Sequence, residues 1–281
     1  AEVAAQLQSQ LGNDGEREAR ELVAAVMHQP RFWPSTAAAV SLDDVSLARI
    51  REAAARRAAG APLAYAVRSA PPKSFLKKEI TVEEALGARM IAWPFGLYDC
   101  AAQTDGAAAV IVTRRDLARN YHDRAVIVRA VASASAPHPH TDPAHDFLRW
   151  KPTVAAAEAA YAIAGISDPM RAIDVAQLHD CFTLTELLSY EDLGFIAKGA
   201  AREHIGAGTF ALGGELPVNT DGGLKAFGHP TAATGLRMVY ENVLQLQGRA
   251  GARQVPGATT ALSHNIGGYP TGCAVSILSR E

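Results

Sequence analysis

The chain has 281 residues, of which 48% are hydrophobic and 20% charged, and its formal net charge is −2. This composition is typical of a globular protein with one large or two modest domains, and the charge gives no reason to expect nucleic acid or an anionic membrane surface as a partner. The three cysteines form neither a CxxC pair nor an even set, so we expect no disulfide framework and a cytoplasmic location. The sequence shows no apolar run of the roughly 20 residues that a membrane span needs, and its acidic, Ala-rich start does not resemble a signal peptide.

Residues 1–70 have a helical pattern. One apolar stripe at helical spacing consists of Ala19, Leu22, Val23, Val26 and Met27. A second helix is expected from an N-cap at Ser41 to Gly60, with Val45, Ile50 and Ala54 on its apolar face. The proline-rich stretch 60–73 then predicts a joint, so we expect a small all-α domain at 1–70 and a second domain at 71–281.

The second domain alternates strands with helices. The predicted strands are 106–113, 125–131, 172–178, 259–263 and 273–278, and the predicted helices are 152–164, 183–193 and 231–247. Such alternation is typical of an α/β fold, in which helices cover a largely buried sheet.

The segment 219–235 (NTDGGLKAFGHPTAATG) is the most informative in the chain. Its glycines, including Gly228, permit backbone conformations closed to other residues. Pro230 suits the first turn of the following helix, which would put His229 at the helix N-terminus. The helix dipole there disfavours imidazolium and favours a neutral ring that accepts a proton. A plain loop or capping role for His229 fits the same residues.

A second segment, 174–194, places His179 and Cys181 at the end of a strand. Thr183 and Glu186 have the T-x-x-E spacing of a capping box, which would start the next helix. Cys181 near that helix N-terminus is expected to have a lowered thiol pKa. The alternative is that Cys181 is a small core residue and His179 a hydrogen-bonded structural one.

A third segment, 263–272 (SHNIGGYPTG), is a glycine-rich turn between two strands. The backbone N–H groups of Gly267 and Gly268 are candidates for an oxyanion site. Equally, these glycines could serve only the hairpin, with His264 and Asn265 as ordinary turn residues.

Together the three segments resemble thiolases of the sterol-carrier-protein-x type, also called lipid-transfer-protein thiolases. The resemblance lies in Gly228-His229-Pro230, in the HDCF tetrad 179–182 and in the HNIGG stretch 264–268, and it extends over about residues 73–281. It implies a thiolase-like C-terminal domain, a layered mixed sheet with helices, behind the small all-α domain.

The resemblance also implies roles for individual residues. His229 would be the base that activates a nucleophilic cysteine, and Cys181 would take and return the α-proton of an acyl thioester. His179 would be an oxyanion donor, in the place of the asparagine of an NEAF motif. Asn265 occupies the place of the second catalytic cysteine of most thiolases. The implied oxyanion and substrate loop residues are Asn265, Gly267, Gly268 and Gly228.

In thiolases the nucleophilic cysteine belongs to an N-terminal half that these 281 residues do not match. Cys100 lies where the family uses no catalytic residue. We therefore expect acyl-CoA as the substrate, no cofactor and no metal, but little activity from this chain by itself. The implied partner is a separate thiolase N-terminal half or another subunit, in a homo- or hetero-oligomer.

Residues 1–70 resemble a different family. The stretches 17–27 (REARELVAAVM) and 55–69 (ARRAAGAPLAYAVRS) are similar to the helical N-terminal domain of release-factor glutamine methyltransferases. That domain helps to dock the release factor, and the methyltransferase domain itself has no counterpart in the sequence.

Two alternatives to a thiolase remain open. One is a thiolase-fold aldolase acting on steroid side-chain CoA thioesters, with Tyr269 as a candidate acid/base. The other is a non-catalytic binding or assembly module, which would not require a nucleophile.

Overall fold

The computed structural model describes residues 19, 20, 22, 23, 26, 27, 44–58, 82–268 and 271–281. The chain divides into two compact units, Ala1–Glu79 and Ile80–Glu281. The predicted proline-rich joint at 60–73 lies outside the described residues, and so do Ser41 and Gly60. Within the described ranges, no helix combines the length and apolar character that crossing a membrane requires.

The first unit contains helix α4 (Asp44–Ala58), which buries its apolar face against the predicted stripe. The buried cluster consists of Ala19, Leu22, Val26, Ile50, Ala53 and Ala54. Val45 is 69% exposed, so its predicted place on the buried face is wrong. A complete all-α domain over residues 1–70 stays a prediction.

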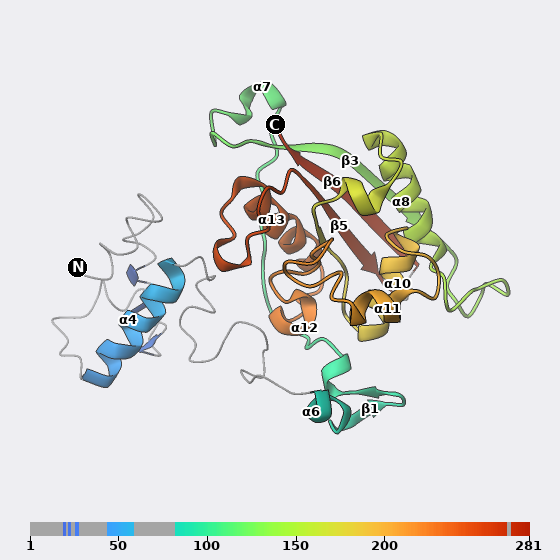
Figure 1. Ribbon diagram of the computed structural model, residues 1–281, viewed down its shortest axis with the longest axis horizontal. Helices are drawn as coiled ribbons and strands as arrows, with labels where there is room; N and C mark the ends of the chain where they lie inside the picture. Colours follow the sequence, from blue (N-terminus) through green and yellow to red (C-terminus); the bar gives the residue numbers. More distant parts are fainter. Residues whose placement is uncertain (1–18, 21, 24–25, 28–43, 59–81, 269–270) are drawn as a thin grey trace. The chain divides into compact units, whose positions relative to one another are not determined.

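The second unit is built on a four-stranded mixed sheet in the order β3-β6-β5-β4 (Figure 1). Strands β3 (Val126–Ser135) and β6 (Gly272–Arg280) are antiparallel, as are β6 and β5 (Thr260–Gly267). Strand β4 (Val175–Gln177) runs parallel to β5. The predicted α/β class with a layered mixed sheet is confirmed.

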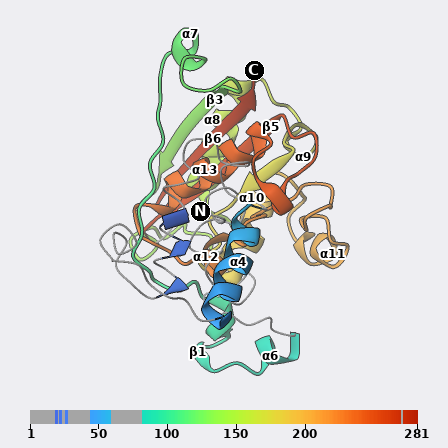
Figure 2. The same cartoon turned by 90° about the vertical axis from the view of Figure 1, so that its left-hand side faces the viewer.

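Helices α8 (Lys151–Ala164) and α13 (Thr234–Gln247) cover opposite faces of this sheet (Figures 1 and 2). Neighbouring residues of a strand point to opposite faces. Accordingly, Ile277 of β6 shares a buried cluster with Ala157 of α8, whereas Leu278 shares another with Leu246 of α13. Burial on both faces explains why the neighbouring residues Ile277 and Leu278 of β6 are both apolar.

The remaining elements of the second unit are short. They are α6 (Val82–Leu86), β1 (Met90–Ala92), β2 (Phe95–Gly96), a 3₁₀ turn (Leu97–Asp99), α7 (Arg115–Ala118), α9 (Pro169–Ala172), α10 (Thr183–Asp192), α11 (Ala201–Gly206), α12 (Gly223–Phe227) and a second 3₁₀ turn (Gly251–Arg253). Strand β1 pairs with β2 in a separate antiparallel two-stranded sheet. The helices predicted at 152–164 and 183–193 correspond to α8 and α10, and the one predicted from 231 begins at Thr234.

The strand predicted at 106–113 is wrong. This stretch has no strand partner among the described residues, and Ile111 and Val112 are 82% and 79% exposed. An apolar run of strand length forms a strand only when a neighbouring strand satisfies its backbone N–H and C=O groups.

Candidate active site

The ends of β4 and β5 bring His179 and Asn265 together. Gln177 of β4 is in register with Ser263 of the parallel strand β5. His179 and Asn265 each lie two residues further along, so they continue the same row on the same side. His179 Nδ1 and Asn265 Oδ1 are 2.8 Å apart.

His229 meets this pair from a separate loop. Its ring lies edge to face with that of His179, with centroids 5.1 Å apart. The Thr234 hydroxyl donates to the backbone oxygen of Pro230 at 3.1 Å, and its oxygen lies 2.8 Å from His229 Nδ1. In this network the neutral His229 ring carries its proton on Nδ1 and leaves Nε2 free to accept one.

Burial lowers the pKa of His229, which keeps the ring neutral as expected. The predicted cause was wrong, however. Helix α13 begins at Thr234 rather than next to His229, so partial burial of the ring, and not the helix dipole, disfavours imidazolium.

A short extended segment links Cys181 to His229. The Ala101 N–H donates to the Cys181 backbone oxygen at 2.8 Å, and the His229 N–H donates to the Ala102 oxygen at 2.7 Å. The successive residues Ala101 and Ala102 therefore bond to the backbones of Cys181 and His229, respectively. The structure thus brings His179, Asn265, His229 and Cys181 into one connected arrangement.

The Cys181 thiol has a raised pKa, which corrects the predicted lowering. Burial is the main cause, and the neighbouring Asp180 carboxylate adds to it, whereas a contact of 3.6 Å with the Thr185 hydroxyl acts in the opposite direction. Cys181 precedes the N-cap residue Phe182 of α10, and the backbone N–H groups there lower its pKa by less than burial raises it.

The predicted capping box at α10 is also wrong. Thr183 is already helical, and its hydroxyl donates to Asp99 Oδ1 at 2.8 Å instead of capping the helix. Glu186 turns away from the helix start and pairs with Lys225 at 3.2 Å. The spacing was right for the motif, but the two side chains have partners elsewhere in the fold.

Gly228 requires the absence of a side chain. Its φ is +93°, and a Cβ would lie 2.4 Å from Thr104 Cγ2. Gly267 ends β5 opposite Gly272, and Gly268 has a φ of +66°. Tyr269 lies outside the described residues. The oxyanion and substrate roles of these glycines and of Asn265 stay predictions.

The orientation of His179 bears on its implied role. Burial lowers its pKa to about 4, and His229 adds to this effect, so the ring is neutral. With Asn265 Oδ1 facing Nδ1, the proton lies on Nδ1 and Nε2 is an acceptor. An oxyanion donor at Nε2 requires the Asn265 amide in the opposite orientation.

The other two cysteines are less suited to catalysis. The Cys100 thiol donates to the Gly96 oxygen at 3.5 Å, and burial together with Asp99 raises its pKa. Burial in strand β6 raises the pKa of Cys273 to about 11. A thiol in either place lacks the neighbouring base that a nucleophile needs, among the contacts of the described residues.

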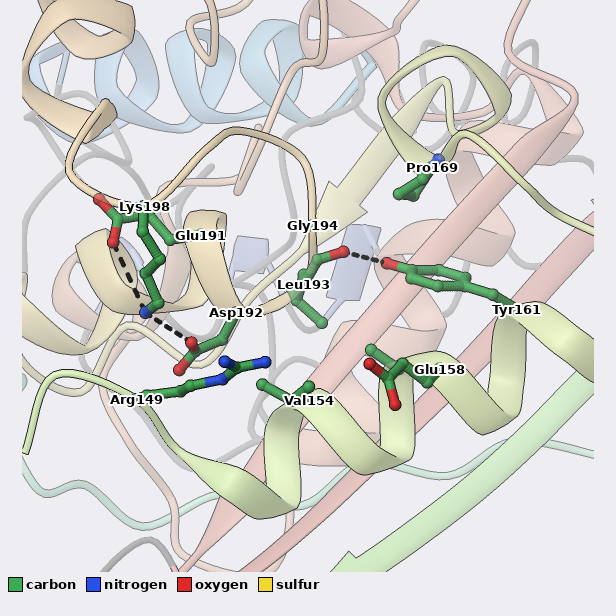
Figure 3. A pocket seen from close by; sticks show the side chains of 11 residues that line it. Arg149, Val154, Glu158, Tyr161, Pro169, Glu191, Asp192, Leu193, Gly194 and Lys198 are labelled. Carbon is green, nitrogen blue, oxygen red and sulfur yellow. Dashed lines mark hydrogen bonds and ion pairs between the residues drawn. The ribbon is translucent and has the colours of Figure 1, made fainter. Parts of the chain in front are cut away.

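A cavity of about 320 Å³ lies elsewhere, between α8 and the end of α10 (Figure 3). Its described lining includes Arg149, Glu158, Tyr161, Asp192 and Lys198, and none of the predicted site residues. We place the candidate site at the histidine cluster, formed by His179, His229, Asn265 and Thr234, because there polar side chains from separate segments contact one another.

Sequence reasoning missed two residues of the site. Thr234 orients His229, and Asp180 is a buried carboxylate that accepts hydrogen bonds from the backbone of α12. Asp180 stands within the HDCF tetrad, but the sequence alone assigns it no role. The importance of Thr234 depends on a turn whose geometry the sequence does not specify.

Comparison with known proteins agrees with this arrangement. A family model described as thiolase C-terminal domain-like matches residues 133–280. An acetyl-CoA acetyltransferase from Methanothermobacter thermautotrophicus is 43% identical over 209 residues, which cover 74% of this chain and 54% of that protein. Sterol carrier protein 2 from Oryctolagus cuniculus is 35% identical over 206 residues, covering 70% of this chain and 36% of that protein. This chain therefore spans only about a third to a half of these relatives.

A solved structure titled Ltp2-ChsH2(DUF35) aldolase has a similar fold, with a TM-score of 0.64 at 24% identity, covering 100% of this chain and 62% of the other. The resemblance of residues 1–70 to the methyltransferase N-terminal domain stays a prediction. With the mixed sheet, the histidine cluster and the match over residues 133–280 in agreement, this chain belongs to the thiolase C-terminal domain-like family.

Proposed function

We propose that this domain supplies the acid/base part of a thiolase-type active site that acts on acyl-CoA thioesters. The observation that carries the proposal is the contact of His229 with His179 and Thr234, next to the Ala101–Ala102 link to Cys181. It gives one imidazole with a free Nε2 and one thiol in neighbouring segments, the two groups that proton transfer requires.

The raised pKa of Cys181 favours a proton donor at rest, which suits cleavage of a β-ketoacyl thioester. His229 takes the proton of a nucleophilic thiol, whose sulfur attacks the β-carbonyl carbon. The bond between the α- and β-carbons breaks, and the α-carbon takes the Cys181 proton. Coenzyme A then returns a proton to Cys181 as its thiolate attacks the acyl group, and His229 returns its proton to the departing cysteine.

The nucleophilic cysteine is proposed to come from a thiolase N-terminal half on another polypeptide segment or subunit. Exposed apolar residues in two places support such a partner. Ile111 and Val112 lie in the stretch 106–113, which pairs with no strand in the described part of the chain, and Leu236 and Tyr240 are exposed on α13. Apolar surface of this kind is typical of a face that another domain covers.

An aldolase acting on CoA thioesters is the second candidate, supported by the fold of the aldolase complex described above. Tyr269 is its proposed acid/base. Replacement of Tyr269 by Phe distinguishes the two, because it would abolish retro-aldol cleavage and spare thiolysis.

The experiment is thiolysis of acetoacetyl-CoA by the purified chain, with and without a separately expressed thiolase N-terminal half. We expect no measurable turnover without the partner, since the members of a catalytic unit do not act independently. Turnover is expected on mixing and should be lost with His229→Ala. Full activity of His229→Ala in the mixture would rule out the proposal.

A further inference from the structure

The buried carboxylate of Asp180 connects the two catalytic segments. Asp180 is 1% exposed and lies between His179 and Cys181. Its Oδ1 accepts the Leu224 N–H at 2.6 Å, and its Oδ2 accepts the Lys225 N–H at 3.4 Å. These two N–H groups belong to α12, the short helix that leads directly into Gly228 and His229.

The glycine at position 223 makes this contact possible. A Cβ on Gly223 would lie 2.3 Å from Asp180 Oδ2, and the φ of Gly223 is +62°. The backbone of α12 thus approaches the carboxylate more closely than any other residue type permits.

A second contact, between side chains, also joins α12 to α10. The Lys225 ammonium pairs with Glu186 at 3.2 Å, and the Tyr190 hydroxyl donates to Glu186 at 2.9 Å. Glu186 belongs to the helix that follows Cys181. Hence α12 is held to the Cys181 segment both by Asp180 through the backbone and by Lys225 through its side chain.

We infer that Asp180 is a positioning residue, whose carboxylate holds α12 and thereby fixes His229 relative to Cys181. The inference rests on the proposed function for the catalytic roles of His229 and Cys181, but its test does not require activity. Asp180 acts on His229 through the α12 backbone. Among the described residues, its carboxylate makes no hydrogen bond with the His229 ring or the Cys181 thiol.

Asp180 could act on His229 through its negative charge or by holding α12 in place, and these two roles predict opposite changes in the pKa of His229 when Asp180 is removed. Burial, with Glu186 adding to it, raises the pKa of Asp180 to about 6, so the group is mostly ionised at pH 7.5. If Asp180 acted only through its negative charge, its removal would lower the pKa of the His229 imidazole. If Asp180 holds α12 and the His229 segment that follows it, its removal exposes the His229 ring. The pKa of His229 then rises towards the ordinary value of histidine, because burial is what lowers it.

The test is an NMR titration of the His229 imidazole in the full chain. We compare wild type with Asp180→Asn, which removes the charge and one of the two oxygens that accept the α12 N–H groups, and Gly223→Ala, which keeps the charge but displaces the carboxylate. Gly257→Ala is the control, since Gly257 has a φ of +76° and a Cβ added there would meet no atom within 4 Å. The amide spectrum reports folding of each variant.

We expect the pKa of His229 to rise in Asp180→Asn and in Gly223→Ala, and to stay at the wild-type value in Gly257→Ala. An unchanged or lowered pKa in either of the first two would overturn the inference. Should Asp180→Asn not fold, Gly223→Ala decides the matter. The titration needs no turnover, so it can fail or succeed separately from the proposed thiolase activity.

Discussion

The imidazole rings of His179 and His229 meet edge to face, with an interplanar angle of 84° and centroids 5.1 Å apart. Burial lowers the pKa of both rings, and the neighbouring His229 lowers the pKa of His179 further. Two neutral imidazoles in contact allow one to accept a proton while the other orients a neighbouring polar group.

Thr234 fixes the tautomer of His229. We expect Thr234→Val to remove the partner of Nδ1 and let the proton move between the two nitrogens, while Thr234→Ser keeps the contact. The ¹⁵N chemical shifts of the ring measure this directly. The lost hydrogen bond should also lower the free energy of unfolding by about 1 kcal/mol. Identical ¹⁵N shifts in Thr234→Val and wild type would show that Thr234 does not set the tautomer.

Cys181 should react slowly with iodoacetamide near neutral pH, because burial and Asp180 raise its pKa and the thiolate is the reactive form. The rate should increase as the pH rises above the usual thiol value. Thr185→Ala removes a contact that lowers the pKa and should slow the reaction further, with Thr185→Ser as the matched control. Peptide mapping by mass spectrometry separates Cys181 from the other cysteines. Faster alkylation of Cys181 in Thr185→Ala would show that the Thr185 contact does not lower the pKa of the thiol.

Gly228→Ala should destabilise the second unit by about 1–3 kcal/mol more than Gly257→Ala. Both positions have a positive φ, but only the Cβ at 228 meets a neighbour, Thr104. Urea unfolding of the two variants isolates the steric contribution from backbone strain. Equal destabilisation would mean that the close approach at Gly228 is not required.

His264 is fully buried, and its pKa is lowered to about 3. Between that value and the ordinary pKa of histidine the unfolded chain binds a proton that the native state does not, so the contribution of His264 to stability falls as the pH falls. Wild type should therefore exceed His264→Gln in unfolding free energy by less at pH 5 than at pH 7. The measured quantity is the difference in unfolding free energy between the two proteins. Asp180, with its raised pKa, contributes a pH dependence of opposite sign, but it does so in both proteins and cancels in the difference. A pH-independent difference would argue against a neutral native His264.

The sequence predicts the sheet, the main helices and the three motif segments, because buried strands and amphipathic helices have local patterns. It does not predict partners that come from distant segments. The stretch 106–113 has strand composition but lacks a neighbouring strand in the described residues, and Thr183 bonds to Asp99 rather than capping its helix.

Electrostatic predictions from position in the sequence were less successful. The location of Cys181 before a helix suggested a lowered pKa, yet burial outweighs the helix end and reverses the sign. For His229 the direction was right but the cause was burial. Burial of a single side chain depends on the packing of the whole unit, which the local sequence does not contain.

The central claim is that Cys181 and His229 serve a nucleophile from another half of the site. Its most direct test is acetoacetyl-CoA thiolysis by the chain mixed with a separate thiolase N-terminal half, comparing wild type, Cys181→Ala and Cys100→Ser. We predict that Cys181→Ala abolishes turnover and that Cys100→Ser leaves it unchanged. Turnover that survives Cys181→Ala but disappears with Cys100→Ser would contradict the account and make Cys100 the nucleophile.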